Sequence, residues 1–582
     1  MSFLLGVGVK EALQHSAGKG WFCMHAKPWL PFYPAEVAPA VDYPKQNLAL
    51  FLVTSAQKYP DRPALYFMGK SISYKSLLES AYRMAHVLKS FGVAKGDRVA
   101  IMLPNCPQVV ISYYGTLLAG AVAVMTNPLY MEREILHQMK DSGAKVIITM
   151  DMFAARVERV IAETELKHMI VTSIPDYLPF PKNKLYPIKA KKAGPLPVIN
   201  YGEGVHSFKR VLADASGDPI CEKVDAENDL ALLQYTGGTT GVPKGVMLTH
   251  MNLVANTLQS SNWCYKVEEG KERYLAALPC FHVFGLTALL NQAIYRAGEL
   301  LLVPKFEVAM ILELIRKKKP TLFPGAPTMY IALINHPRIR EYDLSSINAC
   351  ISGSAALPVE VQDTFEELTK GRLIEGYGLT ETSPVTHANP LWGRRKIGTI
   401  GVPVPDTDAK VVHPDTGEEM PIGEPGELIV KGPQVMKGYW NRPEDTFNTL
   451  RNGWLFTGDM ATMDEEGYFT IIDRKKDMII ASGYNIYPRE IEEVLYEHPS
   501  VKEAVVVGTK DAYRGETVKA FIVLKDGAKP DPADLEKFCR SQLAAYKVPR
   551  EYVFRDSLPK TMIGKVLRRK LLEEEDEGRP TG

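Results

Sequence analysis

A run of small and hydroxyl residues that ends in one lysine, "QYTGGTTGVPKG" at residues 234–245, has the composition of a phosphate-binding loop. Glycines let a backbone approach a ligand closely, threonines supply donors, and lysine adds a positive point charge. A Walker A loop needs Ser or Thr directly after its Gly-Lys pair, whereas Lys244 follows Pro243 and precedes Gly245. The apolar run after it predicts a strand and not a helix. The sequence therefore predicts a phosphate loop between two strands, with a flexible surface turn as the alternative, and it excludes a P-loop ATPase.

Two further stretches end predicted strands in glycines and hydroxyl residues: "ISGSAALP" (351–358) and "IEGYGLTET" (374–382). Open α/β sheets bind ligands where their strands end. In the second stretch Tyr377 offers a flat face to a base, and Glu381 beside Thr380 is an oxygen ligand of the kind Mg²⁺ prefers. A turn with a solvated glutamate is the alternative for that stretch.

A carboxylate and an arginine further along the chain suit a sugar. Asp459 in "GWLFTGD" is expected as an isolated acid after a tight turn, where it could accept both ribose hydroxyls. Arg474 lies in the charged junction "DRKKD" (473–477) and could reach the same ribose with its fork of donors. An ordinary salt bridge is the alternative for this arginine.

Two more motifs carry single residues of interest. His282 in "LPCFHVFG" follows an apolar strand, where a lone histidine is most often a packing residue. The glycine-hinged loop "LPKTMIGKVLRR" presents Lys560 and Lys565, and a lysine on such a loop could neutralise charge between a carboxylate and an α-phosphate. A solvated basic face is the alternative for this loop.

The elements that must position these residues follow an α/β pattern. From about residue 98, apolar runs of strand length alternate with segments of helical period, which indicates β-α units on a parallel sheet. Residues 174–228, rich in Pro, Lys, Gly and Asp, suit a connection to a second sheet of the same kind, whose expected strands include "TLFPG" (321–325). Short strands and turns over about 397–472 fit a small antiparallel β-barrel.

The predicted fold class is thus α/β, with a large N-terminal region of two layered α/β subdomains plus the small β-barrel. A compact α+β C-terminal domain follows it, and the family resemblance given below implies that this domain is mobile. The expected boundaries are 1–473 for the N-terminal region and 474–582 for the C-terminal domain.

The amino-acid composition restricts the partners and the cellular compartment of the protein. The 69 basic and 68 acidic residues leave a net charge of +1, which disfavours nucleic acid as a partner. Seven scattered cysteines without a C-x-x-C pair favour a reducing compartment and argue against disulfides and a zinc site. No segment reaches the roughly 18 apolar residues of a spanning helix. We therefore expect a cytoplasmic protein, with peripheral membrane contact left open.

Together and in this order, the motifs resemble the adenylate-forming superfamily of acyl-CoA synthetases, luciferases and peptide-synthetase adenylation domains. The resemblance spans nearly the whole chain and rests on "YTGGTTGVPKGVMLTH", "LPCFHVFG", "EGYGLTET", "GWLFTGD", "DRKKDMIIASGYNIYPREIE" and "PKTMIGK". Within the superfamily the chain is most similar to bacterial long-chain fatty acid–CoA ligases, judging by "KPWLPFYP" and "KGPQVMKGYW" as well.

The resemblance implies a two-step reaction with ATP and coenzyme A as co-substrates and Mg²⁺ as cofactor. A fatty carboxylate attacks the α-phosphate to give acyl-adenylate and pyrophosphate, and the thiol of coenzyme A then displaces AMP. One hinged domain would close in two ways to serve the two steps. Homodimers are common enough in the family that a homodimer is weakly favoured here.

The family's roles carry over onto matching positions. The phosphates would be held by Thr236, Gly238, Thr239, Thr240 and Lys244, and the metal by Thr236 and Glu381. The adenine would be framed by Gly353, Ser354, Ala355, Glu375, Gly376, Tyr377, Gly378 and Thr380, and the ribose by Asp459 and Arg474. The catalytic set would comprise Lys565, His282, Glu381 and Thr236. The hinge would be Lys476, and the coenzyme A path would be shaped by Ser482, Gly483 and Tyr484.

The identity of the acid remains the least determined point. Relatives that activate amino acids place an aspartate near the histidine motif, whereas Cys280, Phe281 and His282 offer no acid to pair with an ammonium group. Medium-chain and aryl acids, the latter as in 4-coumarate-like ligases, are the nearest alternatives to a long-chain acid. A non-catalytic nucleotide- or fatty-acid-binding protein is the alternative of another class.

Overall fold

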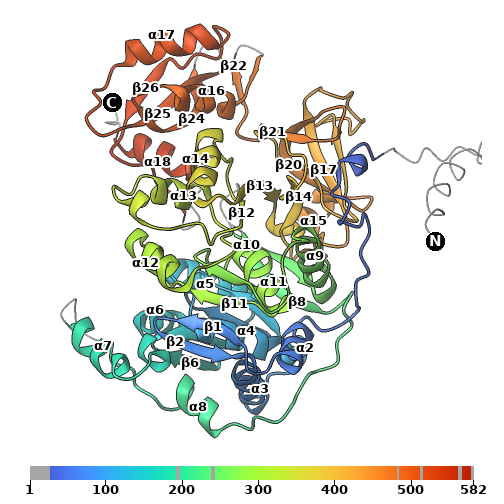
Figure 1. Ribbon diagram of the computed structural model, residues 1–582, viewed down its shortest axis with the longest axis vertical. Coiled ribbons are helices and arrows are strands. Elements are labelled where there is room, and N and C mark those ends of the chain that lie inside the picture. Colours follow the sequence, from blue (N-terminus) through green and yellow to red (C-terminus); the bar gives the residue numbers. More distant parts are fainter. Residues whose placement is uncertain are drawn as a thin grey trace, which may run out of the picture.

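The computed structural model describes residues 27–191, 197–236, 243–481, 484–511, 515–561 and 566–578 (Figure 1). Its largest sheet has eight strands in the order β18-β9-β8-β4-β3-β5-β6-β7. The strands are β3 (Arg98–Met102), β4 (Val122–Met125), β5 (Val146–Met150), β6 (His168–Thr172), β7 (Val205–Ser207), β8 (Leu230–Thr236), β9 (Lys244–Thr249) and β18 (Gly438–Tyr439). The six strands from β8 to β7 run parallel, and β9 and β18 continue antiparallel. The predicted parallel β-α sheet is confirmed.

Several helices lie in the same part of the chain, and the apolar period predicts those that follow β3, β4 and β5. They are α3 (Tyr74–Ser90), α4 (Pro107–Leu118), α5 (Glu132–Ser142), α6 (Asp151–Ile161), α8 (Phe208–Asp214) and α9 (His250–Trp263). Every residue of α4 is buried, which explains why its sequence is mostly apolar and carries no charge. The segment predicted as a connection, 174–228, contains β7 and α8 of this subdomain as well as α7 (Lys182–Lys191), which lies at the edge of the molecule in Figure 1.

The second subdomain contains two four-stranded sheets. One has the order β10-β11-β1-β2, formed by β10 (Arg273–Ala276), β11 (Glu299–Leu302), β1 (Pro63–Phe67) and β2 (Lys70–Ser73). The other has the order β12-β13-β14-β15, formed by β12 (Ala349–Ser352), β13 (Arg372–Gly378), β14 (Val385–Ala388) and β15 (Val402–Pro403). Its helices are α2 (Leu50–Lys58), α11 (Gln292–Tyr295), α12 (Val308–Lys318), α13 (Pro327–Ile334) and α14 (Val359–Thr369).

The prediction of a strand at 321–325 is wrong, because this segment forms only isolated β-bridges. Leu322 makes isolated bridges to Tyr274 and to Ala349, and so joins the two four-stranded sheets. Pro320 and Pro324 flank it, and neither has the N–H that a longer ladder would use.

A short π-helix, Leu286–Asn291, interrupts the helical segment after the histidine motif. It follows α10 (Val283–Gly285) and runs directly into α11. The buried Asn291 at its end accepts a hydrogen bond from Tyr114 Oη at 3.1 Å, across to α4. This contact fixes the rotation of the apolar helix against the first subdomain.

An antiparallel sheet of five strands follows, as predicted. It consists of β16 (Asp408–Val412), β17 (Gly426–Lys431), β19 (Leu450–Arg451), β20 (Trp454–Met463) and β21 (Phe469–Arg474), with α15 (Pro443–Thr449) before β19. The pair Val402–Pro403, placed with these strands by the sequence, instead extends the sheet of β14. Closure into a barrel stays a prediction.

The C-terminal part has hydrophobic clusters of its own, between Ile479 and Leu571, separate from the large core that runs from Trp29 to Phe469. Its sheet contains β22 (Ile479–Ala481), β23 (Tyr484–Ile486), β24 (Val501–Asp511), β25 (Gly515–Leu524) and β26 (Glu551–Phe554). Its helices are α16 (Pro488–Glu497), α17 (Pro532–Gln542) and α18 (Arg568–Gly578). Within the described ranges, no helix combines the length and apolarity needed to cross a bilayer.

Candidate active site

The phosphate loop connects two paired strands, as the sequence predicts. Thr236 ends β8 and Lys244 begins β9, and the two residues are direct partners in the antiparallel ladder. The ladder therefore pins both ends of the loop. Three predicted phosphate ligands, Gly238, Thr239 and Thr240, lie outside the described residues.

Lys244 is held by two residues that sequence reasoning missed. Its ammonium pairs with Asp445 Oδ1 at 2.5 Å and lies 5.3 Å from the centre of the Tyr439 ring. The hydroxyl of Tyr439 donates to Glu381 Oε1 at 2.7 Å. Burial, and next the charge of Glu381, raise the pKa of Tyr439 well above its usual value, so this hydroxyl stays a donor. Tyr439 thus contacts both Lys244, the predicted phosphate ligand, and Glu381, the predicted metal ligand, and we call these three residues the first corner of the site.

The turn that carries Glu381 follows the carboxyl end of β13. Thr380, Glu381 and Thr382 form a single 3₁₀ turn, and the Glu381 carbonyl accepts from Met436 N at 2.8 Å. Before the turn, a Cβ on Gly378 would lie 1.8 Å from the carbonyl oxygen of Pro384. Only glycine fits there, so the chain can fold back and aim Glu381 at Tyr439.

Tyr377, Asp459 and Arg474 form a second corner. Asp459 is 2% exposed; Arg474 Nε contacts its Oδ1 at 2.7 Å, and Tyr377 Oη donates to its Oδ2. The attraction of Asp459 raises the pKa of Arg474. The expectation of an isolated acid is therefore wrong: Asp459 lies within β20, opposite Arg474 of β21, and both of its oxygens have protein partners. The predicted ribose residues do come together.

Glu375 is buried, and its carboxylate accepts from Leu357 N at 3.2 Å. Burial raises its pKa to about 7, and the positive charge of Arg489 on α16 opposes that shift. Arg489 also donates to the Ile471 carbonyl at 3.0 Å, and its backbone N–H donates to Asp473 at 2.8 Å. Glu375 therefore lies where the C-terminal helix α16 meets β21, a contact that no sequence motif indicated.

The histidine motif is wedged between the first sheet and the loop after β12. His282 caps α10, where its Nδ1 accepts from Phe284 N at 3.3 Å, and Gln234 of β8 donates to the Phe281 carbonyl at 3.0 Å. A Cβ on Gly353 would lie 3.0 Å from the Phe284 ring. Gly353, the first of the three predicted adenine residues Gly353, Ser354 and Ala355, thus passes close to this motif, and Ser354 is in the left-handed region at φ 73°.

The hinge and coenzyme A residues are only partly described. Lys476 lies in the turn after β21, and burial lowers its pKa. Lys565, Ser482 and Gly483 lie outside the described residues, and only the backbone of Tyr484, the first residue of β23, is described. In Figure 1, β22 lies at the far end of the C-terminal part from β12 and β13.

The donor set fits Mg²⁺ that arrives with a nucleotide. Glu381 keeps one carboxylate oxygen beyond the one that Tyr439 occupies, and Thr236 supplies a hydroxyl at the root of the phosphate loop. The described residues contain no cluster of three or more His, Cys, Asp or Glu that could hold a metal alone. One carboxylate with substrate phosphates and water is the usual Mg²⁺ arrangement at such sites.

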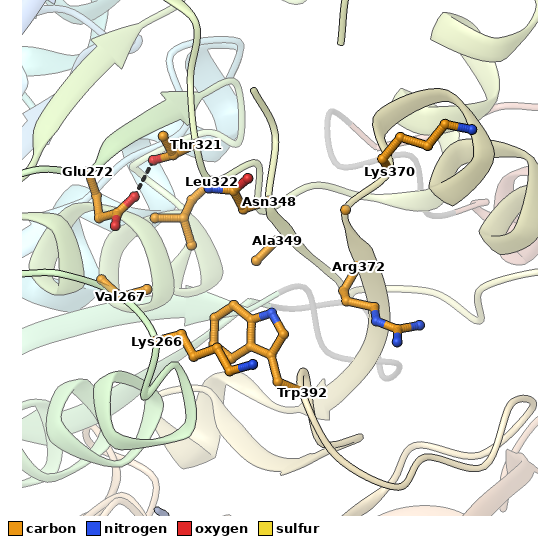
Figure 2. Close-up of a pocket in the computed structure, with 11 residues that line it drawn as sticks. Lys266, Val267, Glu272, Thr321, Leu322, Asn348, Ala349, Lys370, Arg372 and Trp392 are labelled. Carbon is orange, nitrogen blue, oxygen red and sulfur yellow. Dashed lines mark hydrogen bonds between the residues drawn. The ribbon is translucent and has the colours of Figure 1, made fainter. Parts of the chain in front are cut away.

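A cavity of about 360 Å³ lies elsewhere, at the amino ends of β12 and β13 (Figure 2). Its lining includes Asn348, Arg372 and Trp392, and Lys266 lies over the Trp392 ring at 5.6 Å. The charged end of Arg372 points away from that ring in Figure 2. Because the predicted nucleotide residues follow the carboxyl ends of the same strands, this cavity is not part of the candidate site.

Comparison with known proteins agrees with this geometry. Residues 52–440 match the family model "AMP-binding enzyme", and residues 490–565 match "AMP-binding enzyme C-terminal domain". A long-chain-fatty-acid–CoA ligase of Bacillus subtilis (strain 168) is 54% identical over 95% of this chain and 98% of its own length. One of Escherichia coli O6:H1 is 42% identical over 94% and 98%.

Solved structures show the same architecture. The anthranilate CoA ligase AuaEII, in complex with anthranoyl-AMP, superposes with a TM-score of 0.81 at 28% identity. The match covers 92% of this chain and 98% of that one.

Proposed function

Because this chain belongs to the AMP-binding enzyme family, we propose that it is a long-chain fatty acid–CoA ligase that forms acyl-CoA, AMP and pyrophosphate from a fatty acid, ATP and coenzyme A. The observation that carries the proposal is the pair of charged corners: Lys244 and Glu381 joined through Tyr439, and Asp459 joined to Arg474. The relatives named for long-chain acids support the substrate class.

In the first step a carboxylate oxygen of the fatty acid attacks the α-phosphorus of ATP, and the bond to pyrophosphate breaks. Asp459 and Arg474 would hold the ribose, while the loop after β12 and β13 frames adenine with Gly353, Ser354, Ala355, Gly376, Tyr377, Gly378 and Thr380. Glu375 would support this frame from behind, with its buried carboxylate bonded to Leu357 N. Lys565 would neutralise charge between the carboxylate and the α-phosphate.

The departing phosphates would lie against the loop pinned by Thr236 and Lys244, with Gly238, Thr239 and Thr240 as donors. Thr236 and Glu381 would hold Mg²⁺. When bound, the ion offsets negative charge on the phosphate oxygens. Lys244 would exchange Asp445 for a phosphate, so the strength of that ion pair tunes nucleotide binding.

In the second step the thiol of coenzyme A, after loss of its proton to solvent, attacks the acyl carbonyl, and AMP leaves. One arrangement cannot place Lys565 at the phosphate and open a path for the thiol at the same time. We assign the change to rotation of residues 474–582 about Lys476, which would bring Ser482, Gly483 and Tyr484 to the site. His282, which caps α10, would lie beside the acyl carbonyl group in this step.

The deciding experiment is an assay of the purified protein with ATP, Mg²⁺ and acids from acetate to oleate, with and without coenzyme A. Pyrophosphate release that peaks at long chains, with thioester only when coenzyme A is present, is the expected result. A peak at medium-chain or aryl acids would keep the chemistry and overturn the substrate. No release with any acid would leave a non-catalytic binding protein. Sedimentation of the same sample tests the homodimer, and cell fractionation tests a cytoplasmic location.

A further inference from the structure

Asn105 binds the backbone that leads into the histidine motif, residues 278–285. It is the third residue after β3 and is 3% exposed. Its Nδ2 donates to the Ala276 carbonyl at 2.9 Å and to the Leu278 carbonyl at 2.7 Å, and its Oδ1 accepts from Cys280 N at 2.8 Å. Both amide hydrogens and the amide oxygen are therefore engaged by one short stretch of backbone.

The stretch that Asn105 holds is a largely buried loop. β10 ends at Ala276 and α10 begins at Val283, so residues 277–282, all of them described, belong to neither a strand nor a helix. Pro279 lacks a backbone N–H, which removes one of the groups that could fasten the loop locally. Because buried backbone groups need hydrogen-bond partners, the position of this loop depends on the side chain of Asn105.

Gln234 of β8 is a second anchor from the same sheet. It is 4% exposed, and its Nε2 donates to the Phe281 carbonyl at 3.0 Å. β8, β4 and β3 are neighbouring parallel strands, so Gln234 and Asn105 reach the loop from the same carboxyl edge. Gln234 lies two residues before Thr236, where the phosphate loop begins. The two amides therefore fix the histidine motif relative to the phosphate loop.

The histidine motif leads into a buried, mostly apolar segment. His282 caps α10, and every residue from 283 to 294 is buried. A Cβ on Gly285 would lie 2.2 Å from the carbonyl oxygen of Pro279, so the start of this segment folds back closely on the loop. A displaced loop would therefore displace His282 and the segment after it.

We propose that Asn105 is a positioning residue for the acid substrate: by holding the histidine motif at the carboxyl edge of the first sheet, it sets where the carboxylate lies relative to the phosphate loop. This inference rests on the proposed function, which places the acyl group beside His282. Attack on the α-phosphorus needs the reacting atoms roughly 3–3.5 Å apart, and a misplacement of about 1 Å can cost about a hundredfold in rate. The phosphate loop and the ribose pair are held by other strand pairs, so the nucleotide should be affected far less.

Asn105→Ala removes all three hydrogen bonds at once. Pyrophosphate release by the purified full chain is measured at varied oleate with saturating ATP, and at varied ATP with saturating oleate. The variant should lower kcat/KM for oleate at least about tenfold, while KM for ATP changes less than about twofold.

Gln234→Leu should show the same division between acid and ATP to a smaller extent, because it removes one bond to the loop. Leucine also removes Gln234 Oε1, a buried oxygen without a partner in the part of the chain that the structure describes, so this variant should fold even if Asn105→Ala does not. Circular dichroism and melting temperatures check the fold of each variant.

Asn47→Ala is the matched control. Asn47 is 4% exposed, its Nδ2 donates to the Leu117 and Glu222 carbonyls at 2.9 and 3.4 Å, and its Oδ1 accepts from Ala49 N at 2.9 Å. It thus makes the same kinds of bond as Asn105, but where α2 begins and α4 ends. Its loss should lower thermal stability and leave the response to oleate unchanged.

A second readout needs no turnover. Fluorescence of cis-parinaric acid, a long-chain polyene acid, measures binding to the full chain, with α,β-methylene-ATP present to prevent reaction. Asn105→Ala should bind this acid at least about tenfold more weakly than Asn47→Ala. Equal values for the two alanine variants, or equal losses toward oleate and ATP in Asn105→Ala, would make Asn105 an ordinary structural residue and overturn the proposal.

The two assays also separate this proposal from the proposed function. If the unchanged protein releases no pyrophosphate with any acid but binds cis-parinaric acid in a way that depends on Asn105, the ligase fails and the role of Asn105 in acid binding stands. If the unchanged protein is an active ligase and Asn105→Ala matches it in both assays, the role of Asn105 fails and the ligase stands.

Discussion

At the scale of single residues, the side chains predicted to touch the nucleotide are already engaged by the protein. Lys244 is paired with Asp445, and Asp459 is shared by Tyr377 and Arg474. A ligand must therefore exchange one partner for another at each position. The cost of that exchange enters directly into the apparent affinity for ATP.

Asp445→Asn should lower the Michaelis constant for ATP several-fold, because it frees Lys244 from a partly exposed ion pair worth up to about 1 kcal/mol. Initial rates of pyrophosphate release at varied ATP measure this change. Glu444→Gln, on the neighbouring exposed residue of α15, is the control and should have little effect. A raised constant in Asp445→Asn would mean that Asp445 helps to position Lys244 for the phosphate.

Asp459→Asn should raise the Michaelis constant for ATP roughly 10- to 100-fold, since hydrogen bonds to a charged group contribute about 1.5–3 kcal/mol. The amide keeps the shape of the buried carboxylate and can still accept from Tyr377. Asp415→Asn, at an exposed position, serves as the control. An unchanged constant in Asp459→Asn would remove this residue from the ribose site.

Local motifs pointed to Glu381 between two threonines and to Asp459 after Gly458, and the charged junction 473–477 pointed to Arg474. They were not enough to find Tyr439 or Asp445. These two reach Lys244 only because β18 pairs with β9, and a two-residue strand leaves no periodic signal. Whether an acid is isolated or paired likewise depends on the neighbouring strand, as Asp459 shows opposite Arg474.

At the scale of elements, the junction of β13, β21 and α16 joins the two parts of the chain. Arg489 of α16 bonds to β21 and faces the buried Glu375 of β13. Asp473 in the same junction has a pKa raised by burial to about 6. The contact between the parts therefore contains acids that change charge near neutral pH.

Glu375→Gln should make thermal stability less sensitive to pH. Folding raises the pKa of Glu375 from 4.5 to about 7, so the folded state binds the proton more tightly. Its contribution is complete below pH 4.5 and is lost as pH rises through 7, a loss of about 3 kcal/mol at 1.36 kcal/mol per unit. Melting temperatures at pH 5.5 and 8.5 should therefore differ less in Glu375→Gln than in the unchanged protein.

The exposed Glu360→Gln on α14 is the control for that measurement and should keep the original pH dependence. Equal pH dependence in Glu375→Gln and the unchanged protein would show that Glu375 titrates as an ordinary carboxyl.

Long segments with a regular apolar pattern could be predicted as helices and strands. Strands that form by pairing with residues far away in the sequence could not. The β-α units from residue 98 follow from sequence alone, whereas β1 and β2 join the second subdomain from the other end of the chain. Leu322 shows the opposite error, a strand that was predicted and did not form as a full strand. Its apolar neighbours predicted a strand, but the flanking prolines reduce it to isolated bridges.

At the scale of the whole molecule, the two half-reactions would require two positions of the C-terminal part. Lys565→Ala should abolish pyrophosphate release, yet leave thioester formation from supplied acyl-adenylate largely intact. Lys560→Ala is the control on the same segment and should retain release, because Lys560 is paired with Glu503 at 2.6 Å. Equal loss in both assays for Lys565→Ala would remove that lysine from the first step.

Gly483→Trp should show the reverse pattern, with release of pyrophosphate retained and transfer to coenzyme A lost. The bulky side chain would obstruct the expected thiol path only in the second position of the domain. Stopped-flow measurement of each half-reaction separates the two effects. Unimpaired transfer in Gly483→Trp would place the coenzyme A path elsewhere.

The π-helix at Leu286–Asn291 sets the winding of the buried segment that it joins to α11. A π-turn holds more residues per turn than an α-helix, so this segment accommodates more residues than α-helical winding over the same length would. Deleting one residue there should restore α-helical winding and rotate Asn291 by about 100° relative to the segment before it, away from Tyr114. The buried apolar side chains of this segment would then meet different neighbours, so a single residue sets the register in which the segment packs.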